Sequence, residues 1–367
     1  MSPLHRSKLS ICWVAAMRSI EYRQLASILG FFLIVQLAGM LIAFDLITPG
    51  VVQTTPAAGG GISDQVFIYF AYLVAAAVVM VLLFRSRHGP MLFRGVEAIV
   101  VGIASFYLFL IVLSFAFPDS VALPVGAAAL GAVAIVVGKN KWPWLRNTAA
   151  IISSIGVGLV LGLFFNFIAA FVLMALVAAY DYVAVFVTKH MLTLAKASIQ
   201  SNTALMVGSY EVELVPRDSV KKAEASRMLS LFKGTKNREL RKLMKHGRIP
   251  LPSLSALGAG DLAIPLMLAV SAYTTYLSYF FAMVLTASAC FGLVFSMYVS
   301  KRWSTALPAI PPLFSFACVG LGAYILATGA ADWQLAALLF VAAAAILALM
   351  LVTVIRRSRL GLSAKIG

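Results

Sequence analysis

Ten long apolar runs dominate the chain, and each is long enough for a helix that crosses a membrane. A bilayer core is roughly 30 Å thick and needs about 20 apolar residues per helical crossing. Two junctions, near Asn166 and near Tyr279, are predicted to fold back, because one helix through either of them would overshoot the bilayer. The predicted helices are Leu25–Leu46, Gln65–Phe84, Ala98–Phe117, Val121–Gly138, Thr148–Phe165, Ala169–Thr188, Asp261–Ser278, Phe280–Ser300, Ala309–Thr328 and Trp333–Ile355.

The composition of the chain supports this pattern. Hydrophobic residues make up 62% and charged residues only 11% of the 367 residues. Soluble globular domains have far more charge and less apolar content. The sequence therefore predicts an all-α polytopic membrane protein, a bundle of transmembrane helices.

The basic residues predict the orientation of the chain. All 29 Lys and Arg residues lie before the first run, after the tenth, or in every second connection. The other connections carry Asp64, Asp119 and Asp332 instead. Because short cytoplasmic loops are enriched in Lys and Arg, both termini and the long connection after the sixth helix are predicted to be cytoplasmic. The net charge of +16 then reflects contact with anionic lipid headgroups, not nucleic-acid binding.

The longest connection, residues 189–256, differs from the rest of the chain because it is polar and rich in charge. Ser209–Val215 alternates apolar and polar residues and is predicted to form a short strand. Residues 216–246 fit a basic amphipathic helix on the inner leaflet or a solvated linker, and both readings remain open. The expected organisation is a six-helix half (1–188), this cytoplasmic loop, and a C-terminal transmembrane half (257–367).

Two carboxylic acids fall within the predicted membrane region. Asp181 lies inside the sixth predicted helix, and Asp261 opens the seventh, so both approach the membrane from the side of the same loop. A carboxyl group there costs on the order of 2.5–3.5 kcal/mol, which makes a functional role the first hypothesis. We expect the two carboxyl groups to face each other. The alternative is that each packs alone, neutral and hydrogen-bonded to a backbone carbonyl.

A facing pair of carboxyl groups can act as an acid and a base. Mutual repulsion favours sharing one proton, so that the ionised group takes a proton from water while the other protonates a carbonyl. This is peptide-bond hydrolysis as aspartic proteases perform it, and no metal or cofactor is expected. The sequence contains no HExxH, GxSG or Walker-type motif, and the GxxxG at 158–162 favours helix packing. An ion-coupled transporter remains the alternative class, although no internal repeat supports it.

Glycine and proline surround Asp261. Gly258 and Gly260 are expected to allow an unusual backbone geometry and close approach, and Pro250 and Pro252 to discourage a helix before them. Asp261 is therefore predicted to lie where an unwound segment becomes helix. Irregular backbone at membrane depth is tolerated only against protein or a water-filled cavity.

Three short motifs resemble those of the presenilin and signal-peptide-peptidase family of intramembrane aspartyl proteases. The sequence GAGD at 258–261 is similar to the GxGD motif, and YD at 180–181 is similar to the motif of the family's sixth helix. PAI at 308–310 resembles the PAL motif but has Ile in place of Leu. The resemblance implies catalysis by Asp181 and Asp261, and a role in the site or in substrate positioning for Tyr180, Gly258, Gly260, Pro308, Ala309 and Ile310.

The resemblance also implies a fold and a substrate class. Members of the family have nine core transmembrane helices and cut transmembrane peptides or proteins in the bilayer, so the tenth helix is an addition. The motif forms and compact size suggest a prokaryotic, archaeal member. An extended substrate would add as a strand beside residues 249–257 or the Pro308 segment. Pro308 and Pro311 are expected to keep Ala309 and Ile310 extended; the alternative is that these prolines start a helix.

Overall fold

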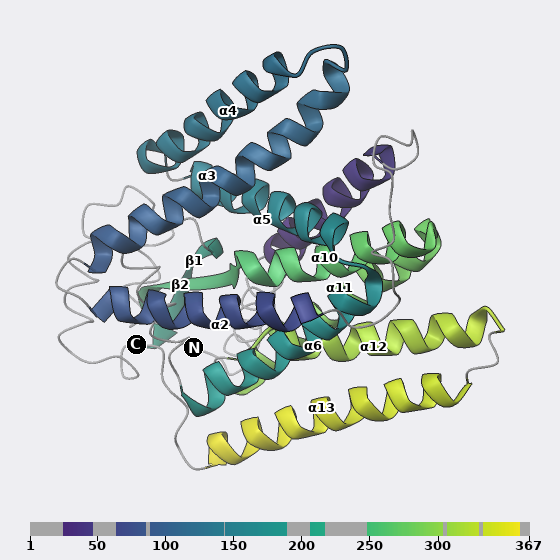
Figure 1. Cartoon of the computed structure of the whole chain (residues 1–367). Helices are drawn as coiled ribbons and strands as arrows, with labels where there is room; N and C mark the ends of the chain where they lie inside the picture. The colour runs from purple at the N-terminus through teal and green to yellow at the C-terminus, as the bar shows by residue number, and fades with distance from the viewer. Residues whose placement is uncertain are drawn as a thin grey trace, which may run out of the picture. The chain divides into compact units, whose positions relative to one another are not determined.

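The structure is a computed structural model that describes eight stretches of the chain (Figure 1). The chain divides into two compact units, and each is described here by itself. One unit comprises Met1–Ile28 and Gly208–Ala256, and the other Leu29–Val207 and Leu257–Gly367. The described stretches are residues 25–46, 64–85, 89–142, 144–188, 206–216, 248–303, 307–329 and 333–359.

All ten predicted helices are present in the described residues. The N-terminal helix covers Leu25–Leu46. Most bounds agree with the apolar runs to within a few residues, and both predicted fold-back points are confirmed. The remaining helices are α2 (Asp64–Arg85), α3 (Gly89–Ala116), α4 (Ala122–Lys141), α5 (Trp144–Phe164), α6 (Phe167–Tyr182), α10 (Ala259–Tyr276), α11 (Tyr279–Trp303), α12 (Ile310–Ala327) and α13 (Trp333–Arg359).

Each fold-back point has a local cause. At the first, the Asn166 side chain caps α6 by accepting a hydrogen bond of 2.8 Å from the Ala169 N–H. At the second, Leu277 ends α10 in the left-handed region with φ 52°, which reverses the chain before α11. The two junctions are therefore tight helical hairpins, as the lengths of the apolar runs require.

Eight of the described helices are long and apolar enough to cross a membrane. The other two are α10 and α2, and the described residues of α2 include the shorter apolar helix Val66–Val79. In α10, Asp261 and the C-terminal polar residues lower the overall hydrophobicity, yet nearly every residue from Leu262 to Tyr273 is buried. Because α10 is surrounded by protein, it does not need the uniformly apolar surface of a lipid-facing helix.

The contact between α5 and α10 is the most extensive helix pairing in the structure. Gly158 and Gly162 of α5 lie against α10, and a Cβ at Gly162 would be only 2.6 Å from the Val270 Cβ. The GxxxG spacing thus serves close helix packing, as predicted. The helices α3 and α4, α11 and α12, and α12 and α13 also pack side by side (Figure 1).

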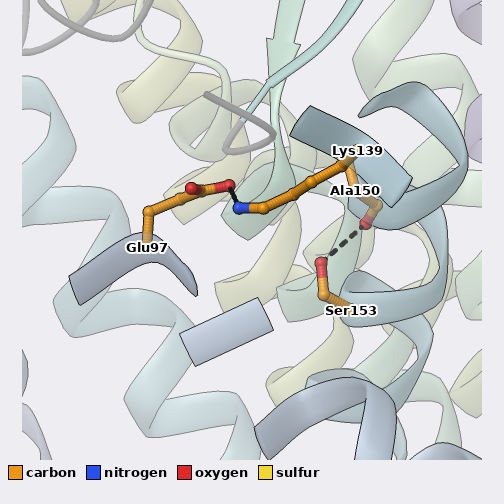
Figure 2. Close-up of polar contacts among 4 residues, drawn as sticks. All are labelled: Glu97, Lys139, Ala150 and Ser153. Carbon is orange, nitrogen blue, oxygen red and sulfur yellow. Dashed lines mark hydrogen bonds and ion pairs between the residues drawn. The ribbon is translucent and has the colours of Figure 1, made fainter. Parts of the chain in front are cut away.

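Several helices, α3 and α4 among them, extend beyond their predicted bounds on the side of the basic connections. The structure begins α3 before Arg94 and continues α4 to Lys141, past the predicted end at Gly138. This places a buried ion pair between Glu97 of α3 and Lys139 of α4, each 3% exposed (Figure 2). Lys139 is therefore a buried helical residue and not part of an open loop.

The described parts of the connection between α6 and α10 form a two-stranded sheet of β1 (Met206–Pro216) and β2 (Arg248–Gly258). The strand predicted at Ser209–Val215 is confirmed by β1. The segment 216–246, predicted as an amphipathic helix or a linker, lies outside the described residues. β2 ends at Gly258, directly before α10 begins, so the predicted change from unwound backbone to helix occurs there.

Candidate active site

An antiparallel register of α6 and α10 places the two intramembrane aspartates at the same level. The Phe167 N–H at the start of α6 donates to the Thr275 hydroxyl near the end of α10 at 2.9 Å. The same number of residues separates Phe167 from Asp181 as separates Asp261 from Thr275, about 21 Å at ~1.5 Å per residue. The two carboxyl groups accordingly lie close enough to interact electrostatically.

Asp181 is held at the start of α12. Its side chain is 6% exposed, and its Oδ2 accepts a hydrogen bond of 3.2 Å from the Ile310 N–H. Pro311 and Pro312 carry no N–H, and the Leu313 N–H already points to the Ala309 carbonyl at 3.4 Å. Ile310 thus supplies a free amide at the positive end of a helix dipole, which favours a carboxylate.

Asp261 lies in the first turn of α10 and accepts a hydrogen bond from the Gly258 N–H at 3.2 Å. Gly258 has φ −65° and ψ 144°, which any residue can adopt, so the predicted unusual backbone geometry is wrong. A Cβ at Gly258 would, however, lie 3.1 Å from Oδ2 of Asp261. Glycine therefore allows a close approach of the carboxyl group that a larger residue would crowd. Gly260 is exposed, and a Cβ there would meet no atom within 4 Å.

Two polar side chains that the sequence analysis missed lie against carbonyl groups of the turn that carries Asp261. Gln36 of the N-terminal helix, fully buried, donates from Nε2 to the Leu262 carbonyl at 3.0 Å. The Ser154 hydroxyl of α5 lies 3.1 Å from the Ala259 carbonyl and 2.7 Å from the carbonyl of its own helix at Ala150. A glutamine in the middle of an apolar run is a signal that could have identified the first of these contacts.

The PAL-like segment differs from the sequence-based expectation. Ala309 has helical dihedral angles (φ −86°, ψ −36°), and Ile310 is the first residue of α12. The predicted extended conformation of these two residues is therefore wrong. The prolines at 311 and 312 occupy the first turn, where their fixed φ favours helix and their missing N–H costs nothing.

The other predicted site residues surround this centre. Tyr180 is half-buried and interacts electrostatically with Asp181. Pro308 is buried directly before the helical start. The structure therefore brings together Asp181, Asp261, Gly258, Tyr180 and the Ala309–Ile310 backbone.

A bundle of membrane-spanning helices that holds two carboxyl groups at one level, each bonded to a backbone amide at the start of a helix, is the arrangement expected of an intramembrane aspartyl protease. The family model described as signal-peptide peptidase, presenilin aspartyl protease matches residues 29–331. The chain belongs to this family and is an aspartic-type intramembrane endopeptidase. This membership decides against the transporter alternative.

A solved structure described as a presenilin family intramembrane aspartate protease has a similar fold. Its TM-score is 0.51 at 20% sequence identity, and the match covers 81% of this chain and 98% of that chain. No curated protein matches the chain. The family match ends at residue 331, before α13 begins at Trp333.

Proposed function

We propose that Asp181 and Asp261 are the catalytic pair and that the enzyme hydrolyses peptide bonds within transmembrane segments of membrane proteins. The register of α6 and α10 carries this proposal, because it brings the two carboxyl groups to one level from separate halves of the chain. Residues 1–188 and 257–367 would then each contribute one acid, with the loop 189–256 between them.

The pair acts with a single shared proton. The ionised carboxylate takes a proton from water as the water oxygen attacks the peptide carbonyl carbon, and the other carboxyl group protonates the carbonyl oxygen. When the tetrahedral intermediate collapses, the C–N bond breaks and the departing nitrogen takes a proton from one carboxyl group. A hydroxyl of the intermediate returns its proton to the other carboxylate as the C=O bond re-forms, so the pair again holds one proton. The Ile310 amide and the Gly258 amide support the charged form of each carboxyl group and fix its direction.

We expect water to reach the pair from the side of Gly260. This residue is exposed, with open space where a side chain would stand, and Asp261 beside it is only partly buried. This open space lies at the first turn of α10, directly after β2 ends.

The substrate is a transmembrane helix that unwinds and pairs with β2. A helix hides its backbone carbonyls, so glycine, proline or β-branched residues near the cut should favour cleavage. Pro250 and Pro252 are two residues apart, so the N–H groups that they lack would have pointed to the same edge of β2. Proline is tolerated in a strand where that edge makes no hydrogen bonds with a neighbouring strand, so this is the free edge of β2. The free edge of β2 would then offer N–H donors to a substrate only from Leu254 onward.

The orientation follows from the basic residues, with both termini and the loop 189–256 in the cytoplasm. A cysteine introduced at Ser219 should resist a membrane-impermeant thiol reagent in intact cells, whereas one at Ser63 should react. The opposite labelling pattern would overturn the orientation.

Cleavage of a transmembrane peptide by the purified chain in liposomes tests the function. Asp181→Asn and Asp261→Asn should each abolish cleavage, and the double variant should be no worse than either single one. Asp119→Asn, an exposed aspartate between α3 and α4, is the matched control and should cleave normally. Appreciable turnover by Asp181→Asn would show that the pair is wrongly assigned.

A further inference from the structure

α13 contacts the helix end that follows Asp181. The Tyr182 phenol lies 2.8 Å from the Thr353 hydroxyl of α13. The Arg357 guanidinium, one turn further along α13, donates to the Phe186 carbonyl and lies over the Phe186 ring at 5.0 Å from its centre. Two polar contacts and a cation–π contact therefore join α13 to the helix that carries Asp181.

A second hydrogen bond of Thr353 shows which hydroxyl donates in its contact with Tyr182. The Thr353 hydroxyl also lies 2.8 Å from the Leu349 carbonyl in its own helix. A hydroxyl has one hydrogen, and a carbonyl can only accept, so Thr353 donates to Leu349 and accepts from Tyr182. The phenol is thus oriented by an acceptor that the backbone of α13 holds in place.

The helix changes its winding directly after Asp181. Residues Val183–Val187 form a π-helical turn, closed by a hydrogen bond of 3.0 Å from the Thr188 N–H to the Val183 carbonyl. Such turns are rare in proteins as a whole, but those that occur are often found at functional sites. A helix end with this winding leaves carbonyl groups without helical partners, and Arg357 satisfies that of Phe186.

Apolar packing reinforces the same contact. Val185 and Phe186 of the π-turn are buried in one cluster with Met350 and Val354 of α13. Leu307, just before the segment whose Ile310 amide binds Asp181, packs against this cluster. α13 therefore contacts the segments on both sides of that hydrogen bond.

We propose that α13 positions Asp181 for catalysis, with Thr353 and Arg357 as positioning residues that act through Tyr182 and the π-turn. This inference rests on the proposed role of Asp181. Successive helical residues are about 100° apart around the axis, so fixing the ring of Tyr182 also fixes the direction of the neighbouring carboxyl group. The family match stops at residue 331, so α13 lies outside the matched residues.

Thr353→Val in the full-length enzyme tests the proposal, because valine keeps the shape and removes the hydroxyl. It should lower kcat roughly tenfold, since a misplacement of about 1 Å can cost on the order of 10²-fold. KM and the thermal unfolding temperature should remain close to wild type, and Thr353→Ser should restore kcat. Thr328→Val is the matched control, because the Thr328 hydroxyl contacts only carbonyls of α12, and it should keep the wild-type kcat.

A double-mutant cycle with Tyr182→Phe tests the contact from its other side and serves if Thr353→Val does not fold. The decreases in kcat caused by the two substitutions should not add, because each substitution removes the same hydrogen bond between Tyr182 and Thr353. Arg357→Gln should lower kcat while Arg356→Gln, at an exposed neighbour, should not. A wild-type kcat in folded Thr353→Val, or full additivity in the cycle, would overturn the proposal.

Asp261→Asn measured in parallel separates this proposal from the proposed function. If Asp261→Asn is inactive while the α13 variants keep full kcat, only the role of α13 is wrong. If Asp261→Asn cleaves normally, the catalytic assignment fails first, and the α13 proposal fails with it.

Discussion

The Gln36 side chain donates a hydrogen bond of 3.0 Å to the carbonyl of Leu262, the residue that follows Asp261. This bond joins the N-terminal helix to the first turn of α10 across 226 residues of sequence. Gln36 is completely buried, and its Oε1 has no hydrogen-bond partner among the described residues. A buried amide that satisfies only one of its groups is costly for folding, so its retention indicates a role in placing Asp261.

Gln36→Leu should therefore separate activity from stability. Leucine has a similar volume and removes the unsatisfied oxygen together with the donor, so the free energy of unfolding should change by about 1 kcal/mol or less. We expect kcat to fall roughly tenfold, because the turn that carries Asp261 loses its link to the N-terminal helix. Gln334→Leu, on an exposed face of α13, is the control. Normal kcat in Gln36→Leu would mean that the bond has no part in positioning.

A second prediction concerns the hydrogen bond from the Ile310 N–H to Asp181. Ile310→Pro removes the N–H that Asp181 accepts and should reduce cleavage on the order of 10²-fold, as expected for loss of a charge-assisted hydrogen bond of about 1.5–3 kcal/mol. Ile310→Leu keeps the amide and the side-chain volume and introduces the residue of the PAL motif. Ile310→Leu should therefore retain cleavage activity. A large loss of activity in Ile310→Leu would show that side-chain packing, and not the amide, is what matters at this position.

Gly258 should be sensitive to the smallest substitution. A methyl group in Gly258→Ala would stand 3.1 Å from Oδ2 of Asp261 and should displace the carboxyl group, lowering kcat. Gly260→Ala meets open space and is in a helix, so it should raise the free energy of unfolding by about 0.5–1 kcal/mol. Cleavage rates and thermal unfolding of the two variants check both expectations. Equal kcat for Gly258→Ala and wild type would contradict the close-approach argument.

Removing one partner of the ion pair between Glu97 and Lys139 should destabilise the protein far more than replacing both partners with apolar residues. Lys139→Met removes the cation that pairs with the buried Glu97 carboxylate and should destabilise the protein by about 3–5 kcal/mol. Replacing both residues, Glu97→Leu with Lys139→Met, should recover most of this loss because no uncompensated charge remains. Thermal unfolding in detergent measures the difference. A double variant as unstable as the single one would show that the pair is not the source of the effect.

The apolar runs predicted the helices well because lipid imposes one simple requirement on length and composition. The fold-back near Tyr279 followed from length alone, although the left-handed Leu277 that produces it could not be predicted from residue type. The positions of Asp181 and Asp261 in sequence indicated a pair because both flank one loop. Their common level in the bundle, however, depends on the register of α6 against α10, which the Phe167–Thr275 hydrogen bond shows only in three dimensions.

The remaining details of the site arise from contacts between distant segments. Ser154 and Gln36 reach carbonyl groups of α10 from helices far away in sequence. The π-turn after Asp181 also has no simple sequence signal, because Val183–Val187 contains only apolar residues that suit an ordinary helix. The prolines at 308–312 were compatible with either an extended segment or the start of a helix. The structure shows the start of a helix, because α12 begins at Ile310.

The modest hydrophobicity of α10 has a consequence for biogenesis. A segment that is not apolar enough to cross on its own is poorly recognised as an independent span during membrane insertion. The reversal at Leu277 joins α10 directly to α11, which does meet that requirement. We therefore expect the two helices to insert together as a hairpin, so that Asp261 enters the bilayer only with a strongly apolar neighbour beside it.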